Sequence, residues 1–294
     1  MQQGESDVAY WELHGRLERG VPRPPGRDVV VLSNLEQGAE TSAGARGLSV
    51  RFVARGCENY RIGGRAYRLD AGQVMIAPHD LGAECEVRKV DRAGTLAICT
   101  LIHEATLDLD WAFGPLVVGA DCTPVGPLLR HTARALWVGS KPKNALARAL
   151  VTSLCSELPD VTEFVARQAA AVEGARPATR LEMVRRANLA QAYLHATPDR
   201  AVGLQELAGT VGISPFRLLA AFQQCFGDTP ASYHRKLRLR LALDEARRRR
   251  VSISAVAGDF GFASASSFSH AYRRAFGRAP VWSKAGPGGV SPQS

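Results

Sequence analysis

The last third of this 294-residue chain contains one sequence pattern that occurs twice. In the first repeat, residues 204–230, apolar residues at helical spacing lead to an inner glycine, and a second apolar stripe ends at an outer glycine and a proline. The second repeat, residues 253–280, has the same order, at an offset of 49 residues up to the inner glycine and 50 residues after it. The matching pairs are Gly212 and Gly261, Gly227 and Gly277, and Pro230 and Pro280.

Each repeat predicts two helices joined by a tight turn, at which glycine supplies the positive φ that other residues avoid. Ser214 and Ser264 stand where an N-cap of the second helix is expected, and Pro215 occupies a first helical position. Residues 231–248 lack Gly and Pro, so they predict one continuous helix between the repeats. The pattern therefore predicts two helix-turn-helix units on a rigid connector. An all-α repeat that does not bind DNA would show the same apolar stripes.

The distribution of charge favours the DNA-binding alternative. Residues 1–199 contain 23 Lys and Arg and 23 Asp and Glu, whereas residues 200–284 contain 14 and 5, a net charge of +9. A compact basic region of this kind suits a polyanion such as nucleic acid, although a solvated basic face is the simpler alternative. Two units on a rigid connector can place their second helices in successive major grooves, about 34 Å apart.

Exposed residues early on a second helix reach base edges, and basic residues further along or on neighbouring helices reach phosphates. We expect base contacts from Ser214, Phe216, Arg217, Leu219, Ala265, Ser266, Ser267, Ser269 and His270. We expect phosphate contacts from Lys236, Arg238, Arg240, Arg273 and Arg274. Phe216 and Leu219 would meet thymine methyl groups or belong to the core, and His270 would read a base or be an exposed histidine without a role.

The N-terminal half differs in texture, with short apolar runs separated by glycines, which is typical of an antiparallel sandwich or barrel. Longer apolar periods then predict helices before a Gly- and Pro-containing string. The expected fold class is α+β. The expected divisions are an arm at 1–27, a β domain at 28–122, a helical region at 123–173, a linker at 174–181, a DNA-binding domain at 182–284 and a flexible tail at 285–294.

A small molecule could bind in the mouth of such a barrel, but no residue identifies the ligand. Arg51 and neighbouring arginines near Tyr60 would attract an anion or lie on the surface. We expect no metal and no cofactor, because His79 and His103 are isolated and the six cysteines include no CxxC pair.

The chain also lacks the motifs GxSxG, GxGxxG and the P-loop, so we expect no enzyme activity. There is no apolar run of membrane-spanning length and no secretory signal, so we expect a cytoplasmic protein.

The C-terminal residues resemble the AraC/XylS family of transcription regulators. The resemblance rests on LQELAGTVGIS, on FRLLAAFQQCFGDTPASYHRKLRLRLA, on SISAVAGDFGFASASSFSHAYRRAFGRAP and on VW, and it covers residues 182–284. It implies an activator near promoters, with duplex DNA and RNA polymerase as partners. The chain departs from the family at Ala220 and His270, where arginine is usual, and at Glu245 and Ala246, where leucines are usual. We therefore expect weak base reading by the first repeat.

Residues 63–78, GGRAYRLDAGQVMIAP, resemble the cupin-like sensing domain that many members carry, which implies control by a small effector. The helices that follow it stand where relatives dimerise, which implies a homodimer. The alternatives are a repressor, a regulator that works through dimerisation without a ligand, and an enzyme of the cupin class.

Overall fold

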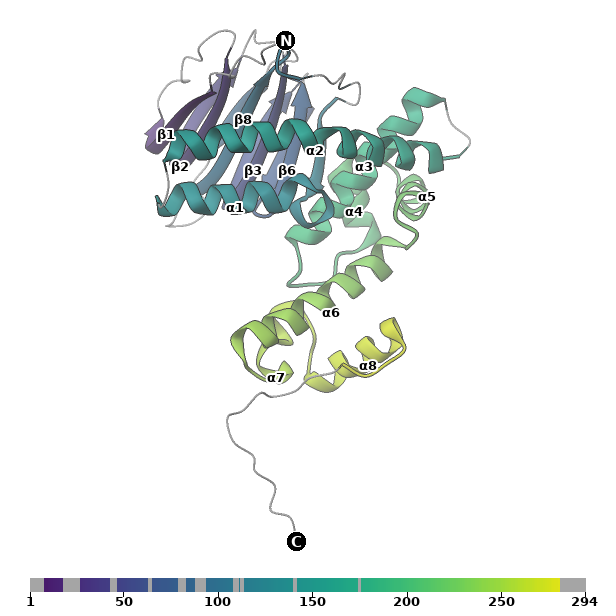
Figure 1. Ribbon diagram of the computed structural model, residues 1–294. Coiled ribbons are helices and arrows are strands. Elements are labelled where there is room, and N and C mark those ends of the chain that lie inside the picture. The colour runs from purple at the N-terminus through teal and green to yellow at the C-terminus, as the bar shows by residue number, and fades with distance from the viewer. Residues whose placement is uncertain are drawn as a thin grey trace. The chain divides into compact units, whose positions relative to one another are not determined.

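The computed structural model describes residues 8–17, 27–42, 47–62, 65–78, 83–87, 94–107, 111, 114–139, 142–173 and 176–280. The chain divides into two compact units between residues 196 and 197, and each unit is described by itself (Figure 1). Among the described residues, no helix is both long and apolar enough to cross a membrane.

The first unit is built on a nine-stranded sheet. Its strands are β1 (Val8–Leu17), β2 (Asp28–Ser42), β3 (Gly47–Arg55), β4 (Cys57–Ile62), β5 (Arg65–Asp70), β6 (Gln73–Pro78), β7 (Ala83–Val87), β8 (Thr95–His103) and β9 (Leu116–Gly119). The order is β5-β4-β7-β2-β8-β3-β6-β9, and β1 pairs with β2 in parallel beside this path. All other pairings among the described strands are antiparallel, as an antiparallel sandwich or barrel requires.

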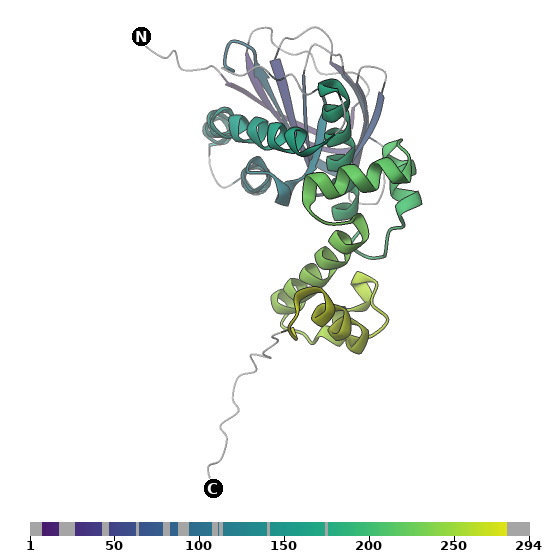
Figure 2. The same ribbon diagram turned by 90° about the vertical axis from the view of Figure 1, so that its right-hand side faces the viewer.

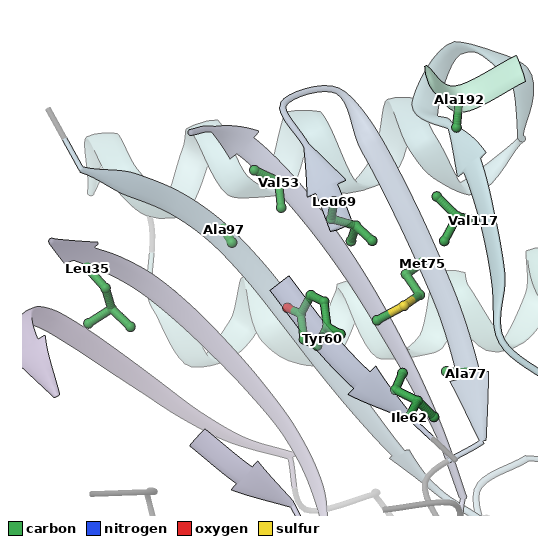
Figure 3. Packing of buried hydrophobic residues seen from close by; sticks show 10 residues of the cluster. All are labelled: Leu35, Val53, Tyr60, Ile62, Leu69, Met75, Ala77, Ala97, Val117 and Ala192. Carbon is green, nitrogen blue, oxygen red and sulfur yellow. The ribbon is translucent and has the colours of Figure 1, made fainter. Parts of the chain in front are cut away.

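The sheet curls so that its inner face encloses an apolar core. Side chains from β2, β3, β4, β5, β6, β8 and β9 meet there, and Ala192 of the helix α3 (Pro177–Ala196) joins them (Figure 3). The inward residues alternate with residues that face outward, because successive side chains of a strand point to opposite faces. Val53 of β3 points inward, for example, and its neighbour Phe52 is buried on the other face.

Two helices cover the outer face of the sheet, α1 (Val125–Val138) and α2 (Lys143–Ala171) (Figure 1). They fall within the predicted helical region at 123–173. Their apolar stripes are buried, with Leu129 and Leu136 on α1 and Leu150 and Leu154 on α2. Both faces of the sheet are therefore covered, which explains why β3 and β8 are buried almost throughout.

The predicted arm needs correction, and three strands of the sheet do not stand out as apolar runs. Residues 8–17 of the predicted arm form β1, which is held by main-chain pairing along β2 although its sequence alternates weakly. Strands β4 and β7 carry charged residues, and β9 has only four residues, so the predicted pattern of apolar runs does not reveal them. Residues 1–7 and 18–26 of the arm lie outside the described residues, as does His79.

The second unit contains only helices and turns among its described residues. It consists of α4 (Leu204–Val211), α5 (Pro215–Phe226), α6 (Pro230–Arg249), α7 (Ile253–Val256), the 3-10 turn η2 (Gly258–Phe260) and α8 (Ala265–Phe276). Figure 2 shows α7 and α8 grouped beside the end of α6. The two helix-turn-helix units and the continuous connecting helix are confirmed.

The division between the units differs from the predicted linker at 174–181. Helix α3, most of which was assigned to the DNA-binding domain at 182–284, belongs to the first unit. Its residues Val184, Ala187 and Asn188 are fully buried, and Gln73 Nε2 of β6 donates a hydrogen bond to the carbonyl of Ala192 at 2.6 Å. The predicted tail at 285–294 lies outside the described residues.

Candidate nucleic-acid interface

The first helix-turn-helix unit comprises α4 and α5. Gly212 ends α4 in the left-handed conformation, with φ of 70°. Ser214 then caps α5 by accepting a hydrogen bond from the backbone N–H of Arg217 at 3.4 Å, and Pro215 is the first helical residue, as predicted. Buried Phe222 contacts the tilted ring of Phe226, at 4.6 Å between ring centroids, and packs edge-on against Tyr233 of α6. The inner face of α5 is thereby fixed, and its outer face is left open.

The predicted base-contact residues of the first repeat lie on that open face. Ser214, Phe216 and Arg217 are exposed, and Leu219 is half-buried. Phe216 is 82% exposed, so it is not a core residue, and its ring is available to an apolar partner such as a thymine methyl group. Sequence reasoning missed Gln223 and Gln224, which are exposed two turns after Phe216 and carry amides that can pair with adenine.

The second helix-turn-helix unit has the same plan, but its first helix is shorter. Helix α7 continues as η2, and Gly261, with φ of 69°, turns the chain toward α8. Ser264 accepts from the backbone N–H of Ser267 at 3.1 Å, and Ser267 Oγ accepts from the backbone N–H of Ser264 at 3.0 Å, which completes a capping box. Buried Phe268 and Tyr272 hold the inner face of α8.

The outer face of α8 is polar and basic. Ser266, His270, Arg273 and Arg274 are exposed, and Ala265 and Ser269 are half-buried. Ser266, His270 and Arg273 follow one another at helical spacing, so their side chains share one face. Ser267 is a correction to the predicted base contacts: its hydroxyl also donates to the carbonyl of Ser264 at 2.8 Å, so the capping box occupies it.

The five residues predicted to contact phosphates occupy different environments. Arg273 and Arg274 are exposed in the last turn of α8. Arg240 is exposed and its guanidinium lies over the Phe276 ring, 5.4 Å from the centroid. Lys236 Nζ lies 2.6 Å from a carboxylate oxygen of Asp228, and this hydrogen bond keeps the pKa of Asp228 below its usual value.

Arg238 does not fit the expected phosphate contact. Its side chain is only 6% exposed, and Nε and Nη2 both donate to the carbonyl of Phe260, at 2.9 and 2.6 Å. Burial lowers the pKa of this guanidinium. Arg238 is therefore removed from the candidate interface. Sequence reasoning overlooked two further cations, Arg235 and Arg278, which are exposed.

The arginines considered for an anion in the first unit are dispersed. Arg51 is buried and lies over the Tyr60 ring, 4.5 Å from its centroid. Arg61 is exposed, and Arg68 is exposed and paired with Asp70 at 2.9 Å. Among the described residues, no group of three or more His, Cys, Asp or Glu could hold a metal ion.

Residues 207–281 match the model of a family described as "Helix-turn-helix domain". The "HTH-type transcriptional regulator AlkR" of Acinetobacter baylyi (strain ATCC 33305 / BD413 / ADP1) is 31% identical over 91 residues, which are 31% of this chain and 30% of that protein. The "Putative AraC-like transcription regulator" of Streptomyces lividans is 31% identical over 87 residues, 30% of this chain and 29% of that protein. The "Probable transcriptional regulator LumQ" of Photobacterium leiognathi is 33% identical over 102 residues, 35% of this chain and 40% of that protein.

The chain thus matches less than half the length of each of these relatives. All three are named as transcription regulators. Among solved structures, unsaturated fatty acid bound ToxT from Vibrio cholerae has a TM-score of 0.30 and 11% identity, over 88% of this chain and 95% of that one. The AraC-like transcriptional activator CuxR has a TM-score of 0.31 and 16% identity, over 67% and 68%.

Proposed function

We propose that this chain, whose C-terminal domain is of the AraC type, is a sequence-specific DNA-binding transcription regulator and not an enzyme. One observation carries the proposal: a single basic unit contains two capped helices, α5 and α8, whose buried faces pack on their own units and whose opposite faces are exposed. Helices presented in this way enter the major groove. Two of them in one chain would read two successive grooves.

The two helices would divide the work by chemistry. On α8, Ser266, Ser269 and His270 would hydrogen-bond to base edges, and Arg273 and Arg274 would hold phosphates. On α5, Phe216 and Leu219 would contact thymine methyl groups, and Arg217 would donate to guanine. Arg240 and Lys236 would add phosphate contacts from the connecting helix. The second repeat would therefore supply most of the hydrogen-bonding specificity.

The test is selection of bound duplexes from a randomised pool by the full chain, followed by titration of the selected duplex at two salt concentrations. We expect two half-sites about 10 base pairs apart, centre to centre, and an affinity that falls with salt. The matched control is His270→Ala with Ser266→Ala, which removes base contacts and keeps every cation. Equal binding of all duplexes by the parent chain would contradict the proposal.

The first unit would sense an effector or join two chains, and the regulator would act in the cytoplasm. The curled sheet with its covering helices supports this role, because it forms a separate unit. We propose activation through RNA polymerase, as the resemblance implies, by a homodimer. Light scattering of the full chain measures its mass and thereby tests the homodimer. A reporter gene under the selected site distinguishes activation from repression, because a signal that falls when the chain is present would make it a repressor.

A further inference from the structure

The buried guanidinium of Arg238 contacts the turn of the second helix-turn-helix unit. Its acceptor is the carbonyl oxygen of Phe260, which is the last residue of η2 and directly precedes Gly261. The same guanidinium lies over the Phe262 ring, 4.9 Å from the centroid. Arg238 therefore contacts the residues on both sides of the turn glycine. Two charge-assisted hydrogen bonds to one carbonyl are short and directional, unlike an apolar contact.

Gly261 shows how closely the turn approaches this guanidinium. A Cβ at this position would lie 2.4 Å from Arg238 Nη2 and 2.6 Å from the backbone oxygen of Asp199. The glycine is thus required for two reasons, its positive φ and the absence of a side chain. The segment that precedes the first repeat also reaches the turn of the second, because Asp199 lies only a few residues before α4.

His234 makes a related contact one turn earlier on α6. It is buried, and its Nε2 lies 2.9 Å from the carbonyl oxygen of Thr197, which accepts a hydrogen bond when Nε2 carries the proton. His234 and Arg238 are four residues apart, so they lie on one face of α6. One side chain binds the segment entering the first repeat, and the other binds the turn of the second. This face of α6 therefore contacts both the segment before the first repeat and the turn of the second repeat.

We propose that Arg238 is a positioning residue that fixes the second helix-turn-helix unit on α6 and thereby sets the half-site spacing the chain accepts. This inference rests on the proposed function. If the turn at Gly261 could shift along α6, helix α8 would move relative to α5. Each base pair inserted between half-sites rotates the second site by roughly 35° about the DNA axis, so a held turn would reject the altered spacing.

The experiment measures the affinity of the full chain for the selected duplex and for duplexes with one base pair inserted or deleted between the half-sites. For the parent we expect a loss of about tenfold or more per altered base pair, similar to a mismatched base. The ratio of the affinity for the selected duplex to that for an altered duplex measures this loss. Arg238→Met should reduce the ratio several-fold. Arg238→Lys keeps a cation but has fewer donors, so its ratio should lie between those of the parent and Arg238→Met. Arg235→Met is the matched control, because Arg235 is exposed on the same helix.

The ratio separates positioning from stability and from charge. Loss of folded protein, or of one cation, weakens binding to all duplexes by the same factor and leaves the ratio unchanged. A parent-like ratio in Arg238→Met would overturn the proposal.

A second measurement does not depend on DNA. Spin labels at exposed Gln205 of α4 and Ala255 of α7 report the distance between the two helix-turn-helix units by double electron–electron resonance. The labels are attached to ketone-bearing amino acids, because the chain has six native cysteines. We expect a narrow distance distribution in the parent and a broader one in Arg238→Met. If the parent binds no specific DNA site, the proposed function fails. Equal widths of the distance distributions in the parent and in Arg238→Met would show separately that Arg238 does not fix the second helix-turn-helix unit.

Discussion

At equivalent positions 50 residues apart, α5 presents Phe216, Gln223 and Gln224 where α8 presents Ser266, Arg273 and Arg274. The outer face of α5 is therefore apolar or neutral except for Arg217, while that of α8 is hydroxylic and basic. The contrast continues past each helix: Asp228 follows α5 and pairs with Lys236, whereas Arg278 occupies the matching place after α8 and is exposed.

The inner faces show the opposite relation. Leu218 and Phe222 of α5 match Phe268 and Tyr272 of α8, and all four are buried. Each helix thus has a fully buried phenylalanine, Phe222 or Phe268, followed four residues later by an aromatic ring that it contacts. Both helices begin at a serine cap and end at a glycine in the left-handed conformation. The backbone plan thus depends on a few internal residues, and the outer face is free to change chemistry. One chain can carry two readers that recognise different features of DNA.

The largest effect is expected from the fully buried phenylalanine that each repeat contains. Phe268→Ala should destabilise the second helix-turn-helix unit by about 3–5 kcal/mol, because a buried phenyl ring is lost and a cavity remains. Hydrogen–deuterium exchange should rise in α7 and α8 and stay low in α4 and α5. Phe222→Ala is the matched variant and should give the mirrored pattern. Equal acceleration in both units would show that they unfold together, and the comparison of separate readers would fail.

His270 offers the next test, because Ala220 at the equivalent position has no polar atom. His270→Ala should remove the base preference at one position of the second half-site, a discrimination of roughly 1–3 kcal/mol. Ala220→His places the same ring on α5 and should create a preference in the first half-site. Selection from randomised duplexes measures both. An unchanged preference in His270→Ala would leave His270 as an exposed histidine without a role.

Arg273 tests whether phosphate binding is concentrated on the second repeat. Arg273→Ala should weaken binding to all sequences alike and reduce the slope of log K against log salt by about one unit, as loss of one phosphate contact does. Gln223→Ala, at the equivalent position, should leave the slope unchanged. The slope comes from titrations at several salt concentrations. Equal slopes for Arg273→Ala and the parent would remove Arg273 from the interface.

The helix-turn-helix units could be predicted from sequence because their determinants are local. The turn glycines, the serine caps and the apolar spacing all lie within about twelve residues of the element they define. Strand β4 could not be predicted, since it carries charged residues and Tyr60 is buried by core side chains from strands distant in the chain. Helix α3 was assigned to the wrong unit for a similar reason, because its buried face is defined by β9 and α2, which precede it in the chain.

The candidate site was predictable in its exposed members and not in its buried ones. Phe216, His270 and Arg273 follow from helical phase alone. Arg238 has the same residue type and helix as the exposed cations, but its acceptor is a carbonyl 22 residues away, which no local pattern reveals. Ser267 was misassigned because one hydroxyl can serve a base or a helix cap, and only the geometry shows which.

The smallest effect is expected from the ion pair of Asp228 in the first repeat, whose matching residue in the second repeat is Arg278. Asp228 and Lys236 are partly exposed, with 27% and 35% of their side chains accessible, so the pair should contribute less than about 1 kcal/mol. The hydrogen bond from Lys236 lowers the folded-state pKa of Asp228, so the contribution is present above the unfolded pKa of about 3.9 and is lost as the pH falls through the lowered folded value. The free energies of unfolding of the parent and of Asp228→Asn, measured by denaturation, should therefore differ slightly at pH 7 and become equal in acid. Arg278→Asn, at the matching position of the second repeat, has no such carboxylate to titrate. A difference in the free energy of unfolding that persists unchanged in acid would mean that Asp228 acts through packing. The charge contrast between the repeats would then affect DNA binding and not stability.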